Sequence, residues 1–340
     1  MHWDRQLPWP GALSKNRRFS GNGERREQAF NRALPCAARQ EIYMRCIILF
    51  CIFIFSFLIT KIARAAETCK VSVSVPPQKF LVERIGKSDV TVNSILGPGV
   101  NPHTHKVSLD DVHNASGSVV YFAMGFPFER NLTGMLVSRC DGLWVIPAYN
   151  GATHSKRSPP EQKGERRVRR REQHVWMCPD NVHRMIEIIA RRLSEEMPEK
   201  KLAFRRNAEI LDAEVDVMDR EIRSRLDKLP ADQRLLLYIT PYWHYFTTHY
   251  GLETYLGPSP RAESLESDFA DSVRLCRENG IKTVLAPPGY PAELARMMAK
   301  AINGKVILID PLEKDWFDTM DRASAALLAP MNLGVYSHLR

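Results

Sequence analysis

The sequence predicts an α/β protein with mostly parallel sheets, divided into two parts by a long helix. Short apolar runs alternate along the chain with amphipathic stretches of helical length, and strands separated by helices are typical of a parallel sheet. One charged stretch, from Glu199 to about Leu229, has neither Gly nor internal Pro. A helix of about 28 residues spans about 42 Å, which is more than one small domain needs, so its natural role is a rigid linker between two domains.

The first 65 residues have the features of a targeting segment. Cys46–Ile59 is almost wholly apolar, but it is shorter than the ~20 residues of a membrane-spanning helix. Small residues follow it at the spacing that signal peptidase reads, which predicts cleavage near Ala65 and export to the periplasm. Met44 is an alternative start to Met1, and an uncleaved anchor behind a basic tail is the alternative to a signal peptide.

Most of the positive charge lies outside the expected folded body. The first 65 residues hold 11 Lys and Arg against 4 Asp and Glu, so they carry +7 of the net charge of +9. The segment 156–172 holds 8 basic and 3 acidic residues, and no aromatic side chain is interleaved with them. Because single-stranded nucleic acid is bound by charge together with stacking rings, we expect no nucleic-acid partner. The basic loop 150–173 is expected to be a solvated insertion.

The periodicity of apolar residues predicts the elements of both halves in order. The expected strands are Val71–Val75, Val90–Leu96, Val119–Phe122, Leu143–Ile146, Leu235–Ile239, Lys282–Leu285 and Val306–Ile309. The expected helices, apart from the linker, are Phe80–Ile85, Leu109–Ala115, Pro179–Met197, Leu265–Asn279, Pro291–Ile302 and Trp316–Leu328. The expected division is an upstream extension and signal peptide (1–65), an N-terminal metal-binding lobe (66–197), a linker helix (198–229) and a C-terminal lobe (230–340).

The loop Gly97–His105 is the first candidate for a binding site. It carries two histidines, and Gly and Pro prevent both helix and strand from running through it. Pro102 restricts Asn101 and so helps to fix the direction of His103, and an imidazole on a rigid loop suits a metal ion. His105 is expected to be an exposed bystander.

Cysteine chemistry is expected to be structural. Four cysteines follow the targeting segment, and export permits one or two disulfides among them without fixing the pairing. The absence of a CxxC pattern argues against zinc binding by thiolates. The four are Cys69, Cys140, Cys178 and Cys276.

Several motifs in order resemble the periplasmic zinc- and manganese-binding proteins of metal ABC importers. The family pattern Gly-x-Asp-Pro-His is matched by Gly99–His103, and Asp-Pro-His-x-Trp-x-x-Pro by Glu172–Pro179. A long helix, an aromatic block that ends in Tyr250–Leu252, and Ile309–Leu312 follow in the family order. The likeness covers nearly all of residues 70–328. It implies two (β/α) lobes joined by a rigid helix, with the metal ion between them.

The resemblance also implies a set of metal ligands. His103 and His174 match the first two positions of the family, and Asp310 matches the fourth. The third falls on Thr240, whose hydroxyl is a poor ligand for zinc. His244 lies four residues further on, about one helical turn along the same face if the segment is helical, and is the expected replacement.

His249 and Glu129 are weaker candidates for a role at the metal site. His249 is the less favoured substitute for the third ligand. Glu129 is expected to be either a partner of a ligating histidine or a surface acid.

The expected function is therefore capture of Zn²⁺, in preference to Mn²⁺, and delivery to an ABC permease by a monomeric protein without enzymatic activity. Two or three imidazoles with one carboxylate suit zinc, and affinity should fall below about pH 6 as imidazoles gain protons. One alternative is a family member whose metal site has degenerated and which binds another solute or a partner. Another is a zinc hydrolase, but no HExxH-like helix is present.

Overall fold

The chain divides into two compact units, Met1–Glu67 and Thr68–Arg340, in a computed structural model. The residues that the structure describes are 44–45, 47–50, 68–140, 142–151, 173–230, 234–257, 265–328 and 334–336. Most of the predicted targeting segment and most of the basic loop lie outside them. Within the described residues, no helix combines the length and the apolar character that crossing a membrane requires.

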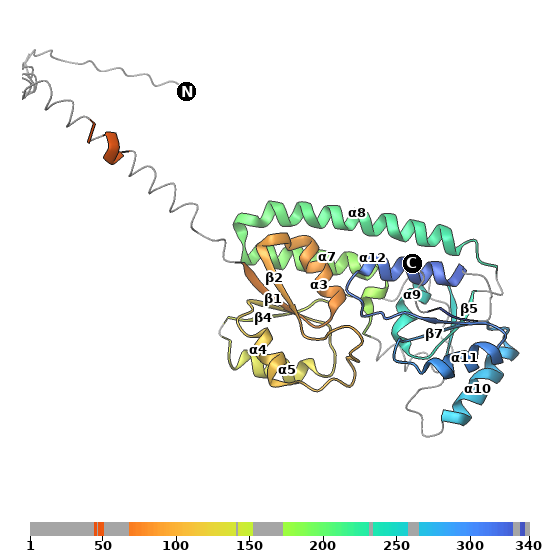
Figure 1. Ribbon diagram of the computed structural model, residues 1–340. Helices are drawn as coiled ribbons and strands as arrows, with labels where there is room; N and C mark the ends of the chain where they lie inside the picture. The colour runs from red at the N-terminus through yellow and green to blue at the C-terminus, as the bar shows by residue number, and fades with distance from the viewer. Residues whose placement is uncertain are drawn as a thin grey trace, which may run out of the picture. The chain divides into compact units, whose positions relative to one another are not determined.

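The first half of the second unit is built on a four-stranded parallel sheet of order β2-β1-β3-β4 (Figure 1). Its central strands are buried: Val71 lies opposite Val92 on one side and Val120 on the other, and all three side chains are in the core. Such burial on both faces is what a parallel sheet covered by helices requires. The strands are β1 (Cys69–Val73), β2 (Val90–Ser94), β3 (Val120–Ala123) and β4 (Trp144–Pro147), and the helices between them are α3 (Pro76–Gly86), α4 (Leu109–Ala115) and α5 (Glu129–Val137).

The second half has a five-stranded parallel sheet of order β6-β5-β7-β8-β9. Its strands are β5 (Leu235–Tyr238), β6 (Glu253–Leu256), β7 (Thr283–Ala286), β8 (Lys305–Leu308) and β9 (Gly334–Tyr336). Its helices are α9 (His244–His249), α10 (Leu265–Glu278), α11 (Ala292–Ala301) and α12 (Trp316–Leu328). In both sheets the strand order reverses beside the first strand, and ligands of open α/β sheets bind at the carboxyl ends of the strands near such a point.

Two helices connect the halves, α7 (Pro179–Glu196) and α8 (Lys201–Leu226), with a short 3-10 turn between them. The long helix α8 has 26 residues, and it packs against α3 and α7 of the first half and α12 of the second (Figure 1). Asn207 donates a hydrogen bond to the carbonyl of Ile85 over 2.8 Å, and Arg225 forms an ion pair with Asp321 over 2.8 Å. The helix α8 therefore has polar partners in both halves, and these contacts hold it along its length.

The predicted α/β class with parallel sheets is confirmed, with instructive differences at the boundaries. Pro76 and Pro77 do not merely end the first strand. They occupy the first turn of α3, where a missing N–H costs no hydrogen bond. The pattern did not predict α5, β6 or β9. The helix α5 contains Thr133 and Gly134, which are poor helix formers, and the two strands are short.

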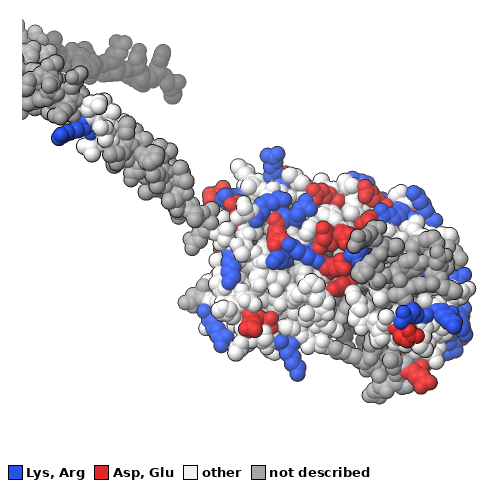
Figure 2. Space-filling view, in the orientation of Figure 1, with Lys and Arg blue, Asp and Glu red and all other residues white. Residues whose placement is uncertain are grey.

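Export permits disulfides among the four cysteines, but in the described part of the chain Cys69, Cys140, Cys178 and Cys276 are all free thiols. Cys178 and Cys276 are fully buried. On the face drawn in Figure 2, basic and acidic side chains are interspersed over the described surface.

Candidate metal centre

The histidine loop that follows β2 is fixed by backbone hydrogen bonds. His103 N–H donates to the side-chain oxygen of Asn101 over 2.9 Å, which forms a tight turn. Gly99 has φ 74°, a conformation that strains residues with a side chain, and its N–H donates over 2.9 Å to Oδ2 of Asp310. This hydrogen bond therefore joins the loop to the segment just after β8, although Asp310 lies 211 residues after Gly99 in the chain.

His174 packs against Trp176, and Trp316 helps to hold Trp176 in place. It is fully buried, and its ring lies 4.9 Å from the ring of Trp176, measured between centroids. Trp176 Nε1 donates to the carbonyl of Pro311 over 2.9 Å, and Trp316 Nε1 donates to the carbonyl of Trp176 over 2.7 Å. The turn that carries His174 is thus connected by two buried hydrogen bonds to the segment that carries Asp310.

The structure brings the two predicted histidines together. The ring centroids of His103 and His174 are 5.4 Å apart, and the planes are inclined by 44°. Imidazole nitrogens bind zinc at about 2.0–2.1 Å, which places two rings at the tetrahedral angle with centroids about 5 Å apart. The observed spacing therefore suits two ligands of one metal ion.

Aromatic rings enclose the histidine pair. Tyr242 lies 4.2 Å from the His174 centroid and is stacked 5.9 Å from that of His103. Phe126 meets both imidazoles edge-on, at 5.5 and 5.8 Å. The sequence shows the aromatic block that ends in Tyr250–Leu252, but nothing in it singles out Tyr242. The position of Tyr242 against the histidines depends on the path of the loop after β5.

Asp310 is a buried carboxylate with both oxygens engaged by backbone donors. Oδ2 accepts from Gly99, and Oδ1 accepts from the N–H of Leu312 over 2.9 Å. Each carboxylate oxygen has a second lone pair, so these bonds do not exhaust its capacity as an acceptor or ligand. Asp310 lies beside the histidine loop through its contact with Gly99.

Thr240 and His244 lie in the segment that follows β5. Thr240 is half-buried, the 3-10 turn Pro241–Trp243 follows it, and His244 begins α9. The segment is thus helical from Pro241 onward, as the replacement hypothesis requires, although its first turn is 3-10. His244 is buried, and its ring lies 6.2 Å from that of Tyr245.

Residues 71–329 match the family model described as ZnuA, the zinc-uptake complex component A, periplasmic. The chain belongs to this family. ZnuA-type proteins are the periplasmic metal-binding components of metal ABC importers, and they are transport components, not an enzyme family.

Individual relatives have low sequence identity to this chain but match most of its length. The chain is 25% identical over 290 residues to the iron-binding protein YfeA of Yersinia pestis, covering 79% of this chain and 89% of YfeA. It is 26% identical over 223 residues to the manganese-binding lipoprotein MntA of Bacillus subtilis, covering 65% and 71%. A crystal structure of ZnuA aligns with a TM-score of 0.67 at 24% identity over 77% of this chain and 98% of that one, which shows the shared fold.

Glu129 is a buried carboxylate, not a surface acid, and it bonds to residues that follow β1 and β3. Its carboxylate accepts from the N–H of Met124 over 2.9 Å, the N–H of Gly125 over 2.7 Å and the hydroxyl of Ser74 over 2.5 Å. Burial raises the pKa of Glu129, although these hydrogen bonds act to lower it. The carboxylate therefore joins the end of β1 to the loop that positions Phe126 beside the histidines.

Replacing Glu129 with glutamine is expected to lower the free energy of unfolding by about 2–3 kcal/mol, because the amide leaves buried N–H donors without acceptors. Chemical denaturation measures the change. Glu293→Gln is the matched control, since Glu293 is exposed on α11 and forms an ion pair with Arg296 over 2.7 Å. Equal effects of the two substitutions would contradict the assigned role of Glu129.

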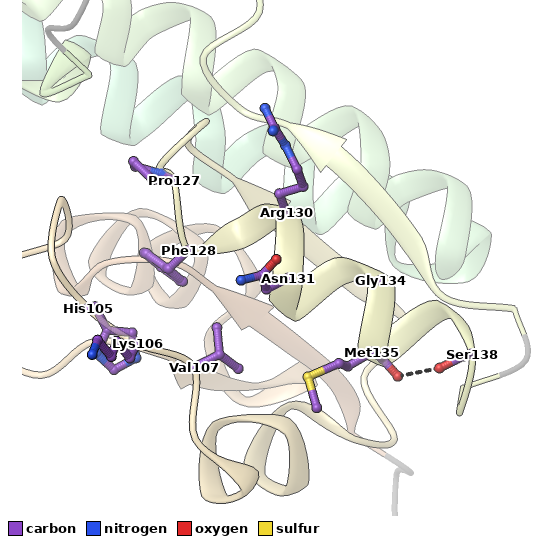
Figure 3. A pocket seen from close by; sticks show the side chains of 10 residues that line it. All are labelled: His105, Lys106, Val107, Pro127, Phe128, Arg130, Asn131, Gly134, Met135 and Ser138. Carbon is purple, nitrogen blue, oxygen red and sulfur yellow. Dashed lines mark hydrogen bonds between the residues drawn. The ribbon is translucent and has the colours of Figure 1, made fainter.

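An open pocket of about 820 Å³ lies on the α5 side of the first sheet (Figure 3). His105 and Lys106 line one side, and Asn131 and Met135 of α5 line the other. His105 is not a fully exposed bystander: Nε2 lies 2.9 Å from Oδ2 of Asp111. None of the four predicted metal ligands lines this pocket, so it is separate from the histidine pair.

Proposed function

We propose that this protein captures a divalent metal ion in the periplasm, zinc in preference to manganese, and delivers it to the permease of an ABC importer. The observation that carries the proposal is the close approach of His103 and His174, which come from segments 71 positions apart in the chain. Membership of the ZnuA family supports the transport role. The metal is the cargo, and the protein acts as a monomer without enzymatic activity or a nucleic-acid partner.

The proposed ligands are His103, His174, His244 and Asp310. Imidazole and carboxylate donors in this ratio fit zinc, whereas manganese prefers more oxygen ligands. His103 lies in the loop after β2, and His244 begins the helix that follows β5, so both lie beyond the carboxyl ends of strands, which agrees with the usual place of ligands in such sheets. Export requires the predicted signal peptide and cleavage near Ala65.

Thr240 favours one alternative function. It stands where the resemblance expects a histidine or an acid, so the site retains two histidines and one carboxylate unless His244 contributes. A protein with only those three donors would bind zinc weakly and serve another solute or a partner.

Replacing His244 with glutamine is expected to weaken zinc binding at least about tenfold, because glutamine keeps the bulk of the buried side chain but is a far poorer ligand. Competition against a chelator of known affinity measures the change. His113→Gln is the matched control, since His113 is exposed on α4. Unchanged affinity in a folded His244→Gln protein would remove His244 from the site and favour the alternative.

A further inference from the structure

A second group of metal-binding side chains lies where α7, α8 and α9 meet. Cys178 is the residue before the first turn of α7, Asp180 is in that turn, and His249 is the last residue of α9. Each offers one ligand atom, and the three atoms all lie within 4.8 Å of one another. Cys178 and His249 are buried, and Asp180 is exposed.

The separations of the ligand atoms fit a tetrahedral zinc ion. Cys178 Sγ is 3.5 Å from His249 Nδ1, which is 3.6 Å from Asp180 Oδ2. With Zn–S of about 2.3 Å and Zn–N or Zn–O of about 2.0–2.2 Å, the edges of the tetrahedron are about 3.5 Å. The three atoms therefore need little movement to enclose an ion.

The other ring nitrogen of His249 contacts two residues of α8, Asp219 and Arg223. Asp219 Oδ1 lies 2.8 Å from His249 Nε2, and the Arg223 guanidinium lies beside both groups. Nδ1 of the same ring faces Cys178 and Asp180. A carboxylate on the far nitrogen is the usual support of a metal-binding imidazole.

We propose that Cys178, Asp180 and His249 form a second zinc site, with water in the fourth position on the exposed side of Asp180. The site is distinct from the His103–His174 centre and does not rest on the proposed transport function. The expectation that thiolates play no part in zinc binding was drawn from the missing CxxC pattern. It does not apply to ligands that the fold brings together over 71 positions.

Binding exchanges a proton for the ion. Zinc binds the thiolate, so the Cys178 thiol releases its proton to solvent as the S–Zn bond forms. The burial of Cys178 argues against a role as a nucleophile, although His249 and Asp180 lie close to it. An ion here would tie the turn that follows His174 to α9 and, through Asp219, to α8.

Cobalt(II) titration of the full-length, reduced protein tests the proposal. A thiolate–cobalt charge-transfer band arises only at a site with a bound cysteine, so the His103–His174 centre does not produce it. We expect two equivalents of cobalt to bind and the band to develop with one of them. The band should disappear in Cys178→Ser and persist in Cys276→Ser, the control for a buried cysteine elsewhere.

Two further variants keep the outcome decisive. Asp180→Asn changes an exposed side chain, so folding is preserved, and it should weaken the cobalt affinity reported by the band about tenfold or more. The double variant His103→Ala, His174→Ala should lose the other equivalent and keep the band. Absence of the band in the wild type, or an unchanged band in Cys178→Ser, would overturn the second site without affecting the proposed transport function.

Discussion

Alanine at His174 is expected to weaken zinc binding by more than about 100-fold. Loss of a group that only orients a metal ligand costs about 10–100-fold, and the loss of a ligand should exceed that. His174 faces His103 at 5.4 Å between ring centroids, so its removal leaves one imidazole of the pair without its partner across the ion. Chelator competition measures the affinity.

His103→Ala is the companion to that substitution and should have a similar effect. His103 is only half-buried, so its replacement perturbs the core less than that of the fully buried His174. The control His113→Ala should bind zinc like the wild type. A folded His103→Ala protein with wild-type affinity would contradict the proposed role of the histidine pair.

Alanine at Trp176 is expected to lower the free energy of unfolding by about 3–5 kcal/mol, the usual cost of truncating a buried tryptophan. The side chain is fully buried, and its Nε1 satisfies the carbonyl of Pro311. The loss should extend to metal affinity, because Trp176 supports the ring of His174 at 4.9 Å. Denaturant unfolding and zinc competition measure the two effects.

Trp144→Ala is the matched control. Trp144 lies on β4 with 54% of its surface exposed, and the Arg192 guanidinium lies 4.5 Å from its ring centroid. Its truncation should cost no more than about 1 kcal/mol and leave zinc affinity unchanged. If both tryptophan variants lost the same stability, Trp176 would not have the supporting role assigned to it.

The sequence predicted the fold well where apolar runs were long or fully buried. The fully buried strands Val120–Ala123 and Thr283–Ala286 lie within one residue of the expected bounds, Trp316–Leu328 has the bounds expected for it, and both sheets are parallel. The strand Glu253–Leu256 was missed because its four residues mix polar and apolar types, and its pairing with β5 supplies what local sequence lacks. The helix α5 was missed because it contains Gly134, a poor helix former, although Leu132 and Leu136 of the same helix are buried.

The candidate site could be predicted only through its motifs. His103 and His174 stood in family patterns, and the structure brings their rings together. Tyr242 carried no such signal, since its position against both rings depends on the loop after β5. The buried contacts of Glu129 depend on long-range folding in the same way, as does the approach of Cys178 to His249.

Calorimetric titration of zinc into the metal-free Cys178→Ser protein tests the central claim most directly, because it removes the contribution of the second site. One equivalent of zinc should bind tightly, and manganese should compete weakly. The same binding should be lost when His103 and His174 are both replaced by alanine. Absence of tight zinc binding, or tight binding that persists without the two histidines, would contradict the account.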